Sequence, residues 1–151
     1  PLRRGTSFAV AVRACGAEGA PCDVAVGLSP EYDEAEEGAL GDGARTCAYT
    51  AQGLALLAGE EVAAGPKLTP GDIVECGLTD DGAVYWQVRG RLIGPLSLPV
   101  ARTSAVLYPA VAFAGAEVEL TRGPGAFAVP ACGPSERPLV TFLGLGFLLG
   151  R

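Results

Sequence analysis

Glycine and proline interrupt this chain so regularly that every apolar segment between them is short. The 151 residues include 22 glycines and 12 prolines, which separate apolar runs rather than gathering in one region. No convincing helix of ten or more residues fits between these breaks, whereas short alternating segments rich in β-branched residues do. The pattern predicts an all-β fold, an antiparallel β-sandwich of short strands with no long helix.

The clearest local signal is a three-stranded meander. The turns Asp81-Gly82 and Arg89-Gly90 need positive φ, which glycine adopts without steric cost. Arg89 is a poor residue for positive φ, so Gly90 is expected to carry the left-handed position by itself. The meander's strands are expected at residues 72–78, 83–88 and 91–93.

Period-2 alternation places Val84, Trp86 and Val88 on one face of the second meander strand, with Tyr85 and Gln87 on the other. Trp86 is therefore expected to anchor the core, with a ligand contact as the alternative.

Outside the meander, the first two expected strands are interpreted as a hairpin, because a Gly/Pro-containing turn separates them. Residues 54–58 form either another strand or a helical turn that continues through Glu60, Glu61 and Ala64. Residues 113–116 are expected to be a turn. Gly27, Gly53 and Gly94 are interpreted as glycines required by turns. The remaining strands are expected at residues 6–13, 23–28, 46–50, 107–112 and 117–121.

The C-terminal region differs from the rest of the chain. A polar linker at 131–138 leads into residues 139–149, which are apolar apart from threonine and glycine. Eleven residues are too few to cross a bilayer, which needs about 20, unless the natural sequence continues the run. We expect one or two buried strands here. The absence of methionine suggests a fragment of a longer polypeptide.

Charge and cysteine content narrow the class of protein. A net charge of −6 with 11 Lys and Arg argues against nucleic acid, whose affinity depends on clustered cations. No signal peptide is visible. Five cysteines without a Cys-x-x-Cys pair are expected to be free core thiols in a reducing compartment, with a disulfide framework or a reactive thiol as alternatives.

The chain has no histidine, so the most frequent general base is missing and Ser/His or Cys/His nucleophile pairs cannot form. Two acidic pairs, Asp80-Asp81 and Glu60-Glu61, are expected in exposed turns, where carboxylates are ordinarily solvated. Residues 29–37 hold five acids in nine residues but lack the spacing of a calcium loop. We therefore predict no catalytic residue, metal site or cofactor.

Several motifs, in order, resemble those of the SPRY domain family. Residues 71–78 resemble its Gly-Asp-hydrophobic strand, and residues 82–94 resemble the hairpin that follows. Leu107-Tyr108-Pro109-Ala110-Val111 matches its Leu-Tyr-Pro-Ala-Val strand. Weaker matches extend the resemblance from about Thr6 to Val129; they lie at residues 7–10, 25–28, 47–53 and 118–127.

The resemblance implies a SPRY-like sandwich over residues 1–130, followed by residues 131–151, whose apolar part packs on the sandwich or on a partner. It also implies recognition of a protein or peptide by loops at one end, without chemistry. Each candidate loop residue has a plainer interpretation, as packing aromatic, half-buried core or solubilising charge. The candidates are Tyr32, Asp33, Tyr49, Gln52, Arg89 and Arg91.

Two functional classes fit this interpretation. One is a domain within a long polypeptide or large assembly, with Leu139, Phe142, Leu143 and Phe147 as a packing interface. The other is an adaptor that captures a peptide, for example in ubiquitin ligation or signalling. Both classes predict an intracellular, cytoplasmic protein without membrane insertion. The first class also predicts a place in the cytoskeleton or another large assembly.

Overall fold

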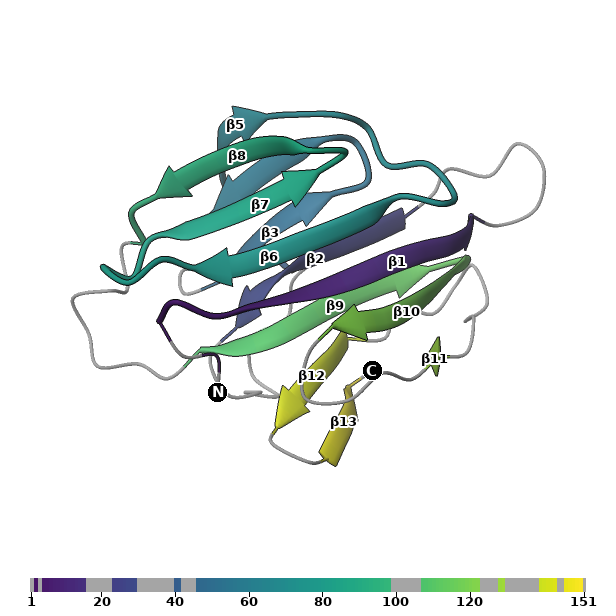
Figure 1. Cartoon of the computed structure of the whole chain (residues 1–151). Coiled ribbons are helices and arrows are strands. Elements are labelled where there is room, and N and C mark those ends of the chain that lie inside the picture. The colour runs from purple at the N-terminus through teal and green to yellow at the C-terminus, as the bar shows by residue number, and fades with distance from the viewer. Residues whose placement is uncertain are drawn as a thin grey trace.

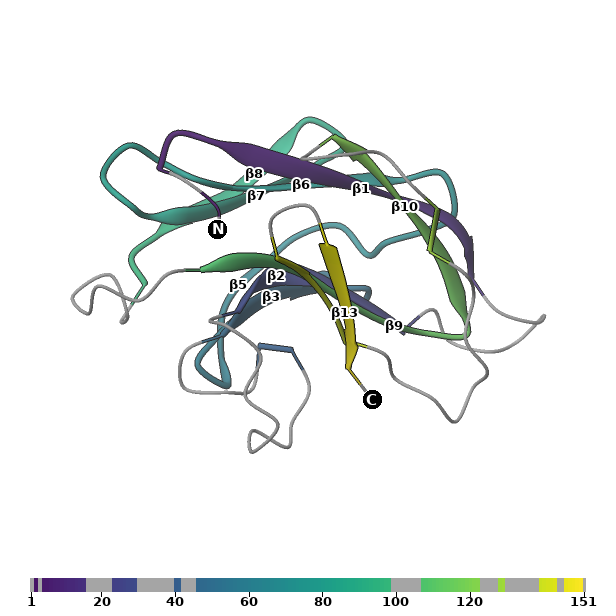
Figure 2. The same cartoon turned by 90° about the horizontal axis from the view of Figure 1, so that it is seen from below.

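Two antiparallel sheets packed face to face form the structure, a computed structural model (Figures 1 and 2). It contains no helix among the residues it describes. This confirms the predicted antiparallel β-sandwich. The described residues are 2, 4–15, 23–29, 40–41, 46–98, 107–122, 128–129, 139–143 and 146–150.

Each sheet combines strands that are distant in the sequence. The six-stranded sheet consists of β11 (Ala128–Val129), β10 (Ala116–Arg122), β1 (Ser7–Cys15), β6 (Ile73–Leu78), β7 (Val84–Val88) and β8 (Arg91–Leu96), in that order. The seven-stranded sheet consists of β13 (Gly146–Gly150), β12 (Leu139–Leu143), β9 (Tyr108–Ala114), β2 (Asp23–Ser29), β3 (Cys47–Thr50), β4 (Leu54–Leu57) and β5 (Glu60–Ala64), also in spatial order.

The expected hairpin between the first two strands is wrong. β1 lies between β10 and β6 in one sheet, and β2 lies between β9 and β3 in the other. Both strands are thus central and depend on partners far along the chain, such as Val10 opposite Val74 and Val26 opposite Val111. Strands that follow each other in the sequence often pair. However, a connection that leads to the other sheet gives the same sequence pattern, two short strands separated by glycine and proline.

The helical alternative for residues 54–64 is also wrong. β4 and β5 form a hairpin in which Leu57 opposes Glu60 across a two-residue turn. Ala58 and Gly59 both have positive φ, 51° and 82°, as this turn requires. The Glu60-Glu61 pair consequently lies in an exposed edge strand rather than in a turn.

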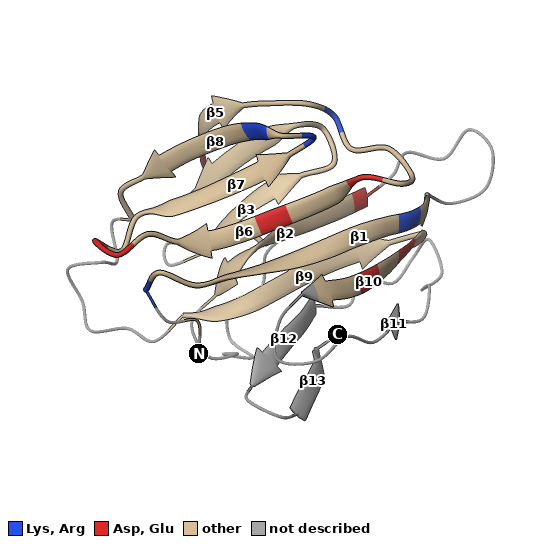
Figure 3. Ribbon diagram, in the orientation of Figure 1, with Lys and Arg blue, Asp and Glu red and all other residues tan. Residues whose placement is uncertain are grey.

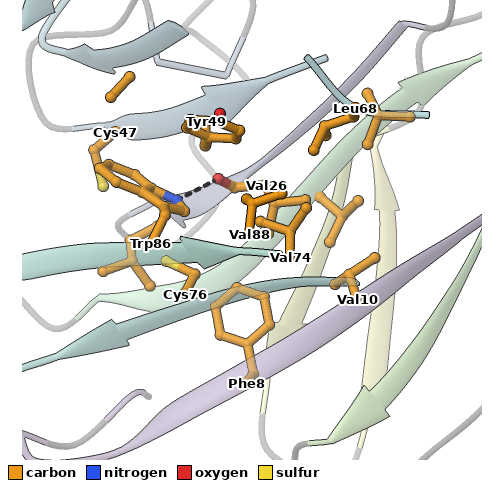
Figure 4. Packing of buried hydrophobic residues seen from close by; sticks show 14 of the residues in the cluster. Phe8, Val10, Val26, Cys47, Tyr49, Leu68, Val74, Cys76, Trp86 and Val88 are labelled. Atoms are coloured by element: carbon orange, nitrogen blue, oxygen red, sulfur yellow. Dashed lines mark hydrogen bonds between the residues drawn. The ribbon is translucent and has the colours of Figure 1, made fainter. Parts of the chain in front are cut away.

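The predicted meander is confirmed as β6, β7 and β8. Along β7, residues Val84, Trp86 and Val88 are buried, whereas Tyr85 is half-buried and Gln87 is exposed. Trp86 is fully buried, and its indole Nε1 donates a 2.8 Å hydrogen bond to the carbonyl of Val26 in the opposite sheet (Figure 4). The expectation that Trp86 anchors the core is therefore correct.

The expected turn at residues 113–116 is replaced by a change of sheet. β9 continues to Ala114 and β10 begins at Ala116, so Gly115 alone separates them, with φ of 59°. β9 pairs within the seven-stranded sheet and β10 within the six-stranded one. Phe113 is buried in the core rather than placed in a loop.

Gly27 lies inside β2, not at a turn as expected. A Cβ atom at this position would lie 1.8 Å from the carbonyl oxygen of Cys47, so the close approach of β3 requires glycine. The turn interpretation is correct for Gly53, whose φ is 81°. The turn interpretation is wrong for Gly94, which lies within β8, opposite an irregularity in β7.

The C-terminal segment extends the seven-stranded sheet. β12 pairs with β9, placing Thr141 opposite Ala110, and β13 pairs with β12 as a hairpin. The expected interface residues all lie on these two strands, and their side chains are outside the described part of the structure; they are Leu139, Phe142, Leu143 and Phe147. A search of the described residues finds no helix long and apolar enough to cross a membrane.

Two of the expected core thiols are confirmed. Cys47 and Cys76 are free and fully buried in the cluster that contains Trp86. Burial raises the pKa of the Cys47 thiol to about 12 and raises that of Cys76 well above its ordinary value. Neither is therefore a reactive thiolate at neutral pH. The side chains of the other three cysteines, Cys15, Cys22 and Cys132, are outside the described residues.

Replacing Trp86 by phenylalanine should destabilise the sandwich by about 1–3 kcal/mol, because the buried hydrogen bond to Val26 is lost together with packing volume. Urea unfolding followed by far-UV circular dichroism measures this. Tyr85→Phe on the outer face is the control and should change stability by less than about 0.5 kcal/mol. Equal effects of the two substitutions would contradict the anchoring role of Trp86.

A variant in which Cys15, Cys22 and Cys132 are serine should show no rapid reaction with a thiol reagent in the folded state at pH 8. Its two remaining thiols should both react once urea unfolds the chain, because folding buries them and disfavours their thiolates. Rapid labelling of the folded variant would show that this part of the core opens.

Candidate functional site at one end of the sandwich

The connection between β5 and β6, residues 65–72, closes one end of the sandwich; we call it the strap. It starts on the seven-stranded sheet, where the Gly65 amide donates to Gly53 (2.7 Å) and the Leu68 amide donates to Ala51 (2.9 Å). It ends on the six-stranded sheet, where the Gly71 amide donates to Val12 at 2.7 Å. Figure 1 shows the strap as the teal connection passing from one sheet to the other.

The middle of the strap is anchored in the core. Leu68 is buried within the main hydrophobic cluster. The hydroxyl of Tyr49 donates a 2.6 Å hydrogen bond to the carbonyl of Pro66. Tyr49 itself is fully buried, which removes its side chain from the exposed partner contacts expected from the sequence. The alternative interpretation of Tyr49 as a half-buried core residue was closer to its observed burial.

Arg89 fastens the strap from the β7–β8 turn. Its guanidinium binds Asp72 through two hydrogen bonds, from Nε to Oδ1 at 2.7 Å and from Nη2 to Oδ2 at 2.5 Å. Nη2 also donates to the Thr69 hydroxyl at 2.8 Å and to the Lys67 carbonyl at 3.2 Å. Because a guanidinium presents its donors in a rigid fork, these contacts fix the strap relative to the turn.

The partner of Arg89 in this ion pair is the carboxylate of Asp72, whose side chain is 9% exposed. Its Oδ2 also accepts hydrogen bonds from the amide and the hydroxyl of Thr69, at 2.7 and 3.1 Å. The Arg89 guanidinium lowers the pKa of Asp72 most, Thr69 acts in the same direction, and burial opposes both. The carboxylate is therefore held ionised.

Arg89 adopts a backbone conformation that the sequence analysis assigned to Gly90 alone. Its φ is 49° and that of Gly90 is 75°, so both turn residues are left-handed, as a two-residue hairpin between Val88 and Arg91 requires. The expectation was wrong because it considered only local propensity. The contacts of Arg89 with Asp72, Thr69 and Lys67 offset the cost of positive φ.

Three cations gather at this end. Lys67, Arg89 and Arg91 are exposed, and Figure 3 shows them in blue on the strap, the β7–β8 turn and the start of β8. Of these three cations, only Arg89 has an ion pair with another described residue. Burial raises the pKa of Tyr49, whereas the nearby charges of Arg91 and Arg89 act to lower it.

The structure brings four sequence-predicted residues to the same end. Gln52 is exposed in the β3–β4 turn, next to Gly53 and the start of the strap. Tyr49 and Arg89 donate hydrogen bonds to strap residues, and Arg91 follows the turn that contains Arg89. The two remaining candidates, Tyr32 and Asp33, are outside the described residues.

Sequence reasoning missed the strap residues of this site, Lys67, Thr69 and Asp72. Asp72 belongs to the Gly-Asp pair that carries part of the family resemblance, but nothing in its local sequence indicates Arg89 as its partner. An ion pair between residues 17 positions apart depends on the tertiary arrangement of the strap and the hairpin.

Both acidic pairs are exposed in the described structure. Asp80 and Asp81 are exposed in the β6–β7 turn, and the Thr79 hydroxyl donates to Asp81. This hydrogen bond lowers the pKa of Asp81. Among the described residues, no group of three or more His, Cys, Asp or Glu side chains is placed to hold a metal ion.

Comparison with known proteins assigns no family to this chain. Neither the models of protein families nor the curated protein sequences give a match. The sandwich and its strap end therefore define the class only as an antiparallel β-sandwich with an exposed, cation-bearing end.

The strap contact should make stability depend on acid pH. Folding lowers the pKa of Asp72, so its carboxylate stabilises the folded state. This stabilisation is fully present above the unfolded-state pKa of about 3.9 and is lost as the pH falls through the lower pKa of the folded state. Asp72→Asn should therefore lower the urea midpoint at pH 7 and have a smaller effect near pH 3. The fluorescence of Trp86, the only tryptophan, reports unfolding.

Arg89→Asn tests the same contact from the other side. Asparagine tolerates the left-handed turn, so this variant removes the ion pair while keeping the turn chemistry. It should lower the midpoint at pH 7 much as Asp72→Asn does, and the double variant should add little. Strictly additive losses would show that the two residues do not stabilise the fold through each other.

Proposed function

We propose that this chain is a non-catalytic protein-protein interaction module of the SPRY type that binds a segment of a partner at the strap end. The resemblance of residues 71–78, 82–94 and 107–111 to SPRY motifs supports this. The lack of histidine argues against most acid–base and nucleophilic catalysis. Recognition is the class of function that fits a rigid scaffold carrying exposed polar groups on its connections.

One observation carries the proposal: residues chosen from the sequence as partner contacts lie at one end of the sandwich. Gln52 and Arg91 are exposed there, and Arg89 is 47% exposed while it fastens the strap. Binding costs less when the contacting groups are already held in place. The hydrogen bonds of the strap to both sheets provide such preorganisation.

The module is proposed to be part of a longer polypeptide or a large assembly, where a second surface packs permanently. β13 forms an edge of the seven-stranded sheet. Its residues, 146–150, include neither charge nor proline, whereas the edge strand β5 carries Glu60 and Glu61 and the edge strand β8 carries Pro95. An edge without such protection is suited to pairing with another chain segment.

The alternative is a peptide-capturing adaptor, for example one that selects substrates for ubiquitin ligation or a signalling partner. The strap end would then be the main binding surface, and the edge at β13 would be covered within the same polypeptide. In both versions we propose a reducing, cytoplasmic location, which the free buried thiols of Cys47 and Cys76 support.

Selection of peptides from a displayed random library against the purified chain tests recognition at the strap end. Selected peptides should bind saturably, and Gln52→Ala or Arg91→Ala should each weaken binding about fivefold, as expected for loss of about 1 kcal/mol. Gln87→Ala, on the outer face of β7, is the matched control and should have no effect. Selected peptides whose binding survives both strap-end substitutions would refute the proposed location.

Size-exclusion chromatography of the same chain distinguishes the two versions. A monomer with saturable peptide binding supports the adaptor. Self-association that Leu148→Lys abolishes supports the assembly component, because a charge on an edge strand opposes further pairing. A monomer for which no peptide is selected would refute both versions.

A further inference from the structure

We propose that the partner segment is acidic, and that Lys67 and Arg91 are the cations that bind its carboxylates. This inference rests on the proposed function and specifies its ligand chemistry. Both side chains are exposed at the strap end, and neither forms an ion pair with any residue that the structure describes. They differ in this from Arg13, which binds Glu119 at 2.7 Å.

The positive charge around the strap and the β7–β8 turn contrasts with the net charge of the chain. The whole chain has a net charge of −6, with 11 basic and 17 acidic residues. Yet residues 65–72 and 89–91 include three cations, Lys67, Arg89 and Arg91, and one carboxylate, that of Asp72, which Arg89 binds (Figure 3). A local excess of positive charge attracts an acidic segment and orients its approach.

The backbone of both proposed binding residues, Lys67 and Arg91, is held in place by the fold. Lys67 lies between two anchors of the strap, since the Pro66 carbonyl accepts from Tyr49 and the Leu68 side chain is buried. Arg91 is the first residue of β8 and opposes Val88. The two come from different elements that Arg89 joins, because Arg89 precedes β8 and donates to the Lys67 carbonyl.

Arg89 acts chiefly as a positioning residue in this site. Its Nε and Nη2 donate to Asp72, Thr69 and the Lys67 carbonyl. Its Nη1 has no hydrogen-bond partner among the described residues, and 47% of the side chain is exposed. A guanidinium has five N–H donors, so Nη1 can add two to a carboxylate bound between Lys67 and Arg91.

A short acidic peptide fits this surface better than a nucleic acid. Tight binding to a phosphate backbone requires neutralisation of many successive charges by clustered cations. Here three cations lie around the strap and the β7–β8 turn, and the acidic remainder of the chain would repel a long polyanion. A segment with a few carboxylates can contact the cations without crossing that acidic surface.

The test uses fluorescence anisotropy of a labelled hexaglutamate peptide titrated with the intact chain, and an uncharged hexaserine peptide as the reference. Hexaglutamate should bind more tightly than hexaserine, and binding should weaken as ionic strength rises from about 0.02 to 0.15 M. Lys67→Gln and Arg91→Gln should each weaken binding about fivefold, as expected for one exposed charge pair.

Arg4→Gln is the matched control, because Arg4 is exposed near the β6–β7 turn at the opposite end and the substitution removes the same charge. An equal loss in Arg4→Gln would overturn the inference, since it would indicate attraction without a site. Tighter binding of a single-stranded oligonucleotide through the same two cations would overturn it in favour of a polyanion.

The result is separable from that of the proposed function. If displayed peptides bind at the strap end but hexaglutamate does not, the acidic ligand is refuted and recognition at this end stands. If neither binds, both proposals fail together. Near-ultraviolet circular dichroism of each variant shows whether the fold is retained, and these exposed substitutions should leave it unchanged.

Discussion

The hydrogen bond from Trp86 to Val26 ties the two sheets together at the centre of the core, and the strap end depends on that arrangement. Trp86 is fully buried on β7, and its acceptor is a backbone carbonyl on β2 of the opposite sheet. A shift of β7 by one residue would turn Trp86 outward and bring Gln87 into the core, so the register is strongly specified. This register also determines where β7 ends, and Arg89 begins the turn at that end.

The strap links this core register to the exposed surface. The strap crosses from one sheet to the other, and Leu68 packs into the core between its two attachments. Arg89 can reach Asp72 only because β7 and the strap end at the same place. A left-handed arginine is a locally unfavourable choice that the ion pair stabilises, and the tertiary contact thus determines the turn rather than the reverse.

The sequence predicted features that depend on short-range patterns, and it failed where distant segments decide. Alternation along β7 and the glycine turns were sufficient for the meander and for Trp86 in the core. The hairpin assigned to β1 and β2 was wrong, because a change of sheet between strands leaves no local sign. For the same reason the bend at Gly115 was mistaken for a turn. The helical alternative for β5 has a different cause, because the local turn that precedes it needs positive φ at Ala58, a conformation that alanine rarely adopts.

In the candidate site, too, the sequence could not show which residues the fold itself uses. The tertiary structure separates the side chains that hold the strap from those that remain exposed. Residue type alone selected Tyr49 and Arg89 together with Gln52 and Arg91, yet the fold uses the first two to hold the strap. It leaves Gln52 and Arg91 exposed, and adds Lys67, which no local motif indicated. Since the fixed pair positions the free residues, we expect a substitution at Arg89 to change both stability and the proposed binding, whereas one at Arg91 should change the proposed binding and leave the strap contacts intact.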